Sequence, residues 1–257
     1  MVMTRTVRRA AGWVAGAAGV AAVGYAAYAG MTWYRYGRAP APNSRPKSRD
    51  ASLIERFMPS YEVAERHEIR VDAPAEYTFA AARNMDVNRS ALVRAIFALR
   101  TFPSRWRREP RERAPIPLLA ETLALGWRLL AEIPGREIAV GAVTQPWRTD
   151  VEFRGVDPDA FAGFKEPGYA KIAWTLEAEP LGPMTSRFRT ETRVSTTDPR
   201  SRRLFRRYWA LLSLGILLIR RESLKLVKAE AERRFQASTP GAGGSLILVR
   251  PEGVLHG

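Results

Sequence analysis

Two ionisable side chains, Glu65 and His67, offer the clearest chemistry in this sequence. They share the phase of Val63 and Ile69 in an alternating run, which predicts that a carboxylate and an imidazole face inward from one strand. Such a pair could orient a hydroxyl, carbonyl or amine of a ligand. A strand end, a bulge or a paired core histidine is the alternative, because a slip of one residue moves both side chains to the other face.

Residues for metal binding or nucleophilic catalysis are scarce. The chain has no cysteine, and His256 is the only histidine besides His67. Proton transfer would therefore depend on Glu65, His67 and Tyr208 alone. We name no metal site, no catalytic residue and no cofactor, and we favour a binding protein over an enzyme.

The charge balance favours anionic partners. Lysine and arginine number 41 against 26 acidic residues, giving a net charge of +15. Six arginines surround Trp106, which predicts contact with anionic lipid headgroups; a solvated loop is the alternative. The remaining basic residues are scattered without a recognised motif, so nucleic acid is the less favoured partner. The six are Arg100, Arg105, Arg107, Arg108, Arg111 and Arg113.

The longest helical pattern, residues 198–235, must position any such site. Asp198 can cap its first turn, and Pro199 suits the first helical position. Apolar residues then recur three and four apart, which predicts an amphipathic helix that needs a broad apolar partner. Gly215 costs about 1 kcal/mol relative to alanine within a helix, and it indicates a bend or a close approach.

Alternating runs elsewhere predict an antiparallel sheet beside that helix. Pro134 and Gly135 mark the turn between two of the strands, and Pro180 to Pro183 mark another. Expected strands cover residues 61–71, 127–133, 136–144, 150–154, 169–179 and 184–196, and expected helices cover 75–84 and 88–99, with a further helix start at 157–158.

The N-terminal segment predicts a membrane anchor. Residues 1–9 are basic, and residues 10–34 carry no charge over a length sufficient to cross a bilayer. A cleaved secretory signal is the alternative, because Ala27-Tyr28-Ala29 fits the small-residue cleavage pattern. We divide the chain into an anchor (1–38), a flexible linker (39–51), a globular domain (52–235) and a flexible tail (236–257). The flanking charges favour a single-pass membrane protein with a cytoplasmic domain; secretion after cleavage is the alternative.

The order of these elements resembles the helix-grip fold of the START-related SRPBCC superfamily, which includes lipid-transfer, pollen-allergen and polyketide-cyclase-like domains. The resemblance is carried by residues 61–74, 168–174 and 190–194 and by the helix over 198–234. It implies an α+β protein in which a curved antiparallel sheet wraps around a long C-terminal helix, with an apolar cavity between them. This superfamily pattern has no invariant catalytic motif.

That resemblance, together with the alternation, predicts a ligand cavity. Ala173 is expected on the outward face of its strand, so that a leucine there would matter little. We expect membrane-anchored binding or transport of a hydrophobic small molecule or lipid. A polyketide cyclase/dehydratase-like enzyme and a non-catalytic membrane-tethered interaction module with a packed core are the alternatives. The candidate ligand-binding residues are Glu65, His67, Trp127, Ile138, Val140, Ile172, Trp174, Leu176, Phe188, Thr190, Thr192, Tyr208, Leu211, Leu212 and Ile219.

Overall fold

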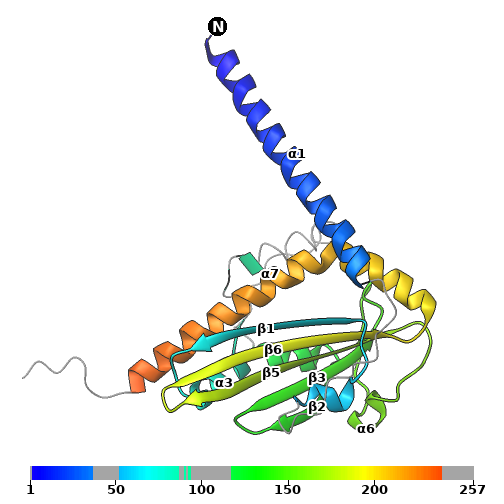
Figure 1. Ribbon diagram of the computed structural model, residues 1–257, viewed down its shortest axis with the longest axis vertical. Coiled ribbons are helices and arrows are strands. Elements are labelled where there is room, and N and C mark those ends of the chain that lie inside the picture. Colours follow the sequence, from blue (N-terminus) through cyan, green and yellow to red (C-terminus); the bar gives the residue numbers. More distant parts are fainter. Residues whose placement is uncertain (1, 37–51, 87–89, 91, 94–116, 239–257) are drawn as a thin grey trace, which may run out of the picture.

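The computed structural model describes residues 2–36, 52–86, 90, 92–93 and 117–238, with side chains from residue 19 onward. The predicted linker, the arginine-rich segment around Trp106, most of the predicted helix over 88–99 and most of the predicted tail lie outside these residues. The rest forms an α+β fold with a long C-terminal helix lying along an antiparallel sheet (Figure 1), which confirms the predicted fold class at this level.

The sheet has six antiparallel strands. Five follow the order β1-β6-β5-β3-β2, and the short β4 pairs with β3. Five of the predicted strands appear close to their expected bounds, and the sixth is reduced to two residues. The strands are β1 Val63–Val71, β2 Arg128–Ile133, β3 Glu137–Thr144, β4 Phe153–Arg154, β5 Ala170–Gly182 and β6 Thr185–Thr196.

The register of β1 decides where Glu65 and His67 point. Glu65 pairs with Thr192 of β6 and His67 pairs with Thr190, and no register shift interrupts this ladder. The odd-numbered side chains of β1 are buried or half-buried, whereas Arg66, Glu68 and Arg70 are exposed. The predicted inward face of β1 is therefore correct, because partnering with β6 along its whole length excludes a slip of one residue.

Helix α7, Pro199–Ser238, lies across the inner face of the sheet (Figure 1). Asp198 caps it as predicted, because its Oδ1 accepts hydrogen bonds from the backbone amides of Arg200 and Ser201 at 2.8 and 3.0 Å. The Ser201 hydroxyl, then the amides of Ser201 and Gly168, lower the pKa of Asp198 well below its ordinary value. The cap thus fixes both the helix start and the Gly168 turn before β5.

The C-terminal half of α7 forms a buried apolar core with α3, Ala75–Arg83. Leu224, Val227 and Ala231 pack there against Leu176 and Phe188 of the sheet. A second core lies further along the same face, where α5, Leu118–Ala124, which the sequence analysis did not predict, adds Leu119 to Phe79, Ile138 and Val140. The N-terminal part of α7 packs Phe205 and Trp209 into a further core with Val63, Ala170 and Val194.

The outer face of the sheet is also covered. Helices α2, Ile54–Phe57, and α6, Pro158–Phe161, pack Ile54, Phe57 and Phe161 against Ala139 and Ala173. Ala173 does face away from α7 as predicted, but it is completely buried. The sequence pattern did not reveal this burial, because α2 was not recognised and α6 was not expected to cover this face. That a leucine at 173 leaves ligand binding unchanged stays a prediction.

The N-terminal helix α1, Val2–Tyr36, meets α7 and projects away from the sheet (Figure 1). The Tyr28 hydroxyl lies 2.9 Å from the Ser213 hydroxyl, close to Gly215, and α7 bends in this region (Figure 1). Among the described residues, no helix combines the length and apolarity needed to cross a membrane. The transmembrane assignment of residues 10–34 therefore gains no support from the residues that the structure describes.

Candidate ligand pocket

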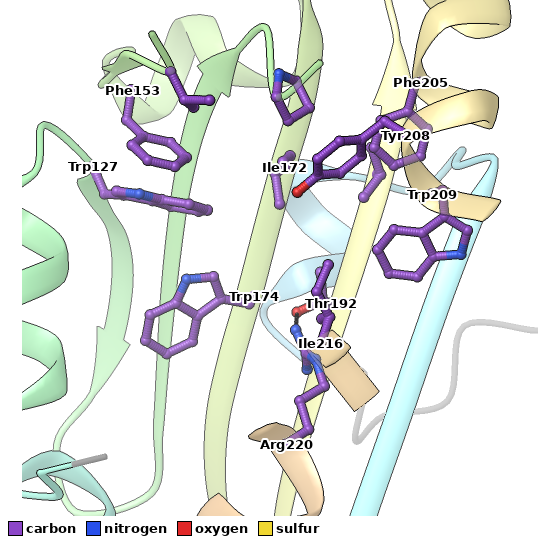
Figure 2. Close-up of a pocket in the computed structure, with 13 residues that line it drawn as sticks. Trp127, Phe153, Ile172, Trp174, Thr192, Phe205, Tyr208, Trp209, Ile216 and Arg220 are labelled. Atoms are coloured by element: carbon purple, nitrogen blue, oxygen red, sulfur yellow. Dashed lines mark hydrogen bonds between the residues drawn. The ribbon is translucent and has the colours of Figure 1, made fainter. Parts of the chain in front are cut away.

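A pocket of about 260 Å³ lies between α7 and the inner face of the sheet (Figure 2). Strands β4, β5 and β6, the residue before β2 and the loop after β3 contribute one side, and α7 contributes the other. Its apolar lining consists largely of aromatic rings. The lining residues are Trp127, Pro146, Val151, Phe153, Ile172, Trp174, Thr192, Val194, Phe205, Tyr208, Trp209, Ile216 and Arg220.

Two groups of aromatic rings face each other across the pocket. On the sheet side the Trp127 ring lies 5.1 Å from that of Phe153 and 6.4 Å from that of Trp174. On the helix side Phe205 lies 5.9 Å from Tyr208 and stacks on Trp209 at 5.8 Å. Figure 2 shows these groups on opposite sides of Ile172. Flat rings on both sides favour a planar or elongated apolar guest.

One end of the pocket, away from the Phe153 and Phe205 rings, is polar, because Arg220 of α7 lies there (Figure 2). An Nη atom of Arg220 donates a hydrogen bond to the Thr192 hydroxyl. Its Nε atom is buried and has no hydrogen-bond partner among the described residues. Burial lowers the pKa of Arg220 to about 10, so the guanidinium remains charged at neutral pH.

Glu65 and His67 lie behind this polar end, on β1, and do not line the pocket themselves. The Tyr36 hydroxyl donates to Glu65, and His67 Nε2 lies 3.8 Å from the other Glu65 oxygen. Burial, followed by the charge of Arg220, lowers the pKa of His67, which keeps the imidazole neutral at pH 7. The predicted pair therefore exists as a half-buried polar cluster next to Arg220.

The structure places five of the predicted site residues around the pocket: Trp127, Ile172, Trp174, Thr192 and Tyr208. Four others, Ile138, Val140, Leu176 and Phe188, belong to the two packed cores, and Ile219 packs against the first of them. Thr190 is buried beside His67 on β6.

Leu211 and Leu212 are corrected by the structure. Their exposed fractions are 55% and 39%, so neither side chain is enclosed by the pocket. They lie where α1 meets α7, since the Tyr25 hydroxyl donates to the Leu211 carbonyl. The sequence pattern assumed a straight helix with one apolar face, whereas α7 bends and divides its apolar residues between the pocket and the outside.

Sequence reasoning missed several lining residues for an identifiable reason. Phe205, Trp209, Ile216 and Arg220 are spaced four, seven and four apart, which is one face of a helix. Arg220 was left among the scattered basic residues. Phe153 lies in β4, within a strand that the sequence predicted, but the pattern gave no signal of its contact with Trp127.

The described residues hold no group of three or more histidine, aspartate or glutamate side chains placed to bind a metal ion. Near the pocket, the arrangement offers two aromatic walls, one buried cation and two hydroxyl groups, those of Thr192 and Tyr208. Such a lining can enclose an apolar body and orient one polar group.

Comparisons with known proteins identify resemblance in fold only. No protein-family model and no curated protein matches the chain. An aromatase/cyclase from Streptomyces sp. R1128 is 14% identical, with 67% of this chain and 94% of that chain covered and a TM-score of 0.26.

Two further solved structures match this chain with comparably low sequence identity and TM-score. A START superfamily protein from Mycobacterium smegmatis is 15% identical, with coverage of 68% and 99% and a TM-score of 0.25. A conserved protein from Geobacillus kaustophilus is 10% identical, with coverage of 66% and 96% and a TM-score of 0.33. A START superfamily protein is thus among the structures to which this chain is similar, as the sequence resemblance to START-related SRPBCC helix-grip proteins led us to expect. Ligand and activity must be argued from the residues of this chain.

Proposed function

We propose that this protein binds a hydrophobic small molecule or lipid in the pocket between α7 and the sheet. The observation that carries the proposal is the pair of aromatic walls around about 260 Å³. This volume is slightly below the range of about 300–1,000 Å³ typical of sites for drug-sized ligands. The ligand, or the part of it that enters, is therefore compact.

Binding without reaction is the better-supported activity. General acid–base catalysis needs a proton donor or acceptor within about 3 Å of the reacting atom. Glu65 and His67 do not line the pocket, and Arg220 is a charged cation that exchanges no proton at neutral pH. Tyr208 and Thr192 supply hydroxyl groups, which suit orientation of a ligand.

Filling the pocket is expected to abolish binding. Ile216→Trp adds an indole to the lining of the pocket and occupies the volume that a ligand ring would fill. The affinity for the neutral probe 2-naphthamide should therefore fall at least about tenfold. Isothermal titration calorimetry on the full chain measures this effect. Leu212→Trp is the matched control, because it adds the same ring one turn earlier at an exposed position. Equal loss in both variants would contradict the assigned pocket.

The fate of the ligand separates the two activities. The full chain is incubated with a bacterial lipid extract, and native mass spectrometry detects any bound species. The bound species is then released from the protein and compared with the original extract by chromatography. We expect a bound apolar species that is recovered unchanged. Recovery of a chemically altered species would favour the polyketide cyclase/dehydratase-like alternative, and binding of neither extract components nor 2-naphthamide would favour an interaction module.

We further propose that α1 associates with a membrane and tethers the binding domain there. The proposal is supported by exposed apolar and aromatic side chains on the described half of α1, including Val20, Val23, Met31 and Tyr34. Arg206 adds a cation beside this surface, 4.1 Å from the Trp33 ring centre, a combination that suits the interface of an anionic bilayer.

Introducing charge into α1 should release the protein from vesicles. In co-sedimentation with vesicles of phosphatidylglycerol and phosphatidylcholine, Val20→Asp combined with Val23→Asp is expected to shift most of the full chain into the supernatant, because a charged group is costly to insert among acyl chains. Lys225→Glu, which changes the net charge by the same amount at an exposed site on α7, is the control. If both variants sediment like the wild type, α1 does not mediate the association.

A further inference from the structure

The unsatisfied donor of Arg220 is a feature that a purely apolar ligand would leave unused. Among the pocket-lining residues that the structure describes, Arg220 alone carries a charge. Its Nη bond to Thr192 holds the guanidinium at the end of the pocket, while Nε is buried without a partner. A buried donor that lacks an acceptor is unfavourable, and a buried cation doubly so. An anionic group in the pocket, beside the guanidinium, would offset the buried positive charge.

Glu65 is the acidic group that faces Arg220, and its charge favours the protonated guanidinium. It does not take the place of a ligand, because its carboxylate accepts from the Tyr36 hydroxyl and lies beside His67. Arg221 adds a further positive charge near His67 from the exposed side of α7. Arg220 and Arg221 together carry two positive charges, against one carboxylate and a neutral imidazole, so the net local charge is positive and favours an anion.

We infer that the pocket selects hydrophobic carboxylic acids, with the apolar body between the aromatic walls and the carboxylate beside the Arg220 guanidinium. The inference rests on the proposed function and names its ligand class. Desolvation of the guanidinium is already part of the folded state, so an acid gains a charge-assisted hydrogen bond without that cost recurring on binding. A neutral ligand of the same shape gains the apolar contact and, from a carbonyl oxygen, only the weaker hydrogen bond of an uncharged acceptor.

Two nearly isosteric probes test this selectivity: 2-naphthoate, which is anionic at pH 7, and 2-naphthamide, which is neutral. Titration calorimetry on the full wild-type chain should show 2-naphthoate binding at least about tenfold more tightly, the effect of one hydrogen bond to a charged group. If the amide binds as tightly as the acid, the carboxylate site is overturned while the proposed function stands. If neither probe binds, the proposed function fails and the inference fails with it.

Substitutions locate the effect on Arg220. Arg220→Met should weaken 2-naphthoate binding about tenfold and change 2-naphthamide binding less than about threefold, because the methionine keeps the apolar contact and removes the charge. Arg221→Met removes the same charge one residue later at an exposed position and should leave both affinities within about twofold of the wild type. Unchanged preference for the acid in Arg220→Met would overturn the assignment.

A second variant keeps the test valid if Arg220→Met does not fold. Glu65→Gln removes the negative charge that faces Arg220 and keeps the shape of the side chain. It should strengthen 2-naphthoate binding about threefold or more and leave 2-naphthamide unchanged, because only the anion is repelled by Glu65. If Arg220 served only to neutralise Glu65 within the fold, both probes would respond to Glu65→Gln alike, and that result would contradict the inference.

Discussion

Replacing Arg193 by alanine is expected to lower the free energy of unfolding by about 3–5 kcal/mol, the usual cost of removing one partner of a buried ion pair. The Arg193 side chain is only 4% exposed on the outer face of the sheet. Its Nε donates to Glu191 at 2.6 Å, and its Nη atoms donate to the Met58 carbonyl at 2.9 Å and to Glu55. Alanine would leave the buried Glu191 without its cation and would release α2 from the sheet.

Urea denaturation of the full chain measures this change. Arg187→Ala is the matched control on the same strand, because Arg187 pairs with Glu179 at 3.6 Å with both side chains more than a third exposed. It should cost less than about 1 kcal/mol. The double variant Arg193→Met/Glu191→Met should be more stable than Arg193→Ala, since it leaves no unpaired buried charge. Equal stability of Arg193→Ala and Arg187→Ala would show that the buried network does not hold α2.

Ala173→Leu is expected to destabilise the protein by about 1–3 kcal/mol, through overpacking of the outer face of the sheet. Ala173 is completely buried against Ile54, Phe57 and Phe161. The layer is tight nearby as well, because a Cβ atom at Gly141, the partner of Ala173 on β3, would lie 2.8 Å from the Phe161 ring. Three added carbons must therefore displace α2 or α6.

The same denaturation experiment supplies the comparison. Ala162→Leu introduces an identical side chain at an exposed position just after α6, and it should change the free energy of unfolding by less than about 0.5 kcal/mol. Because the inner pocket lies on the opposite face, Ala173→Leu should also keep 2-naphthamide affinity within about threefold of the wild type when folded. If Ala173→Leu is as stable as the wild type, α2 and α6 can move to accommodate the larger side chain, and the overpacking argument is wrong.

Local patterns in the sequence were sufficient to predict the elements that frame the pocket. The period of two across β5 and β6, the turn at Pro134 and the cap at Asp198 each depend on neighbouring residues, and each appears in the structure near its expected position. The inward face of β1 was also readable, because alternation along one strand sets which side chains share a side.

The placement of α2 and α6 over the outer face could not be predicted from local patterns. The four-residue α2 has too short a pattern to recognise, and its position depends on Arg193 and Glu137, which lie far from it in the chain. The outward orientation of Ala173 was therefore predicted correctly, while its burial under α2 and α6 was not predicted. Burial depends on what packs against a face, and alternation does not reveal that.

The division of α7 between pocket and core likewise depends on tertiary packing. Its apolar residues look equivalent in sequence, yet Val227 packs in the core that α7 forms with α3, Ile216 lines the pocket and Leu211 is exposed. Arg220 looked like its neighbour Arg221, and only the position of β6 turned it inward to Thr192. A sheet, a long amphipathic helix and their inward faces follow from local periodicity, which is why the sequence alone was enough to predict them. Which residues enclose the pocket, and which charge lies within it, depended on contacts between segments far apart in the chain.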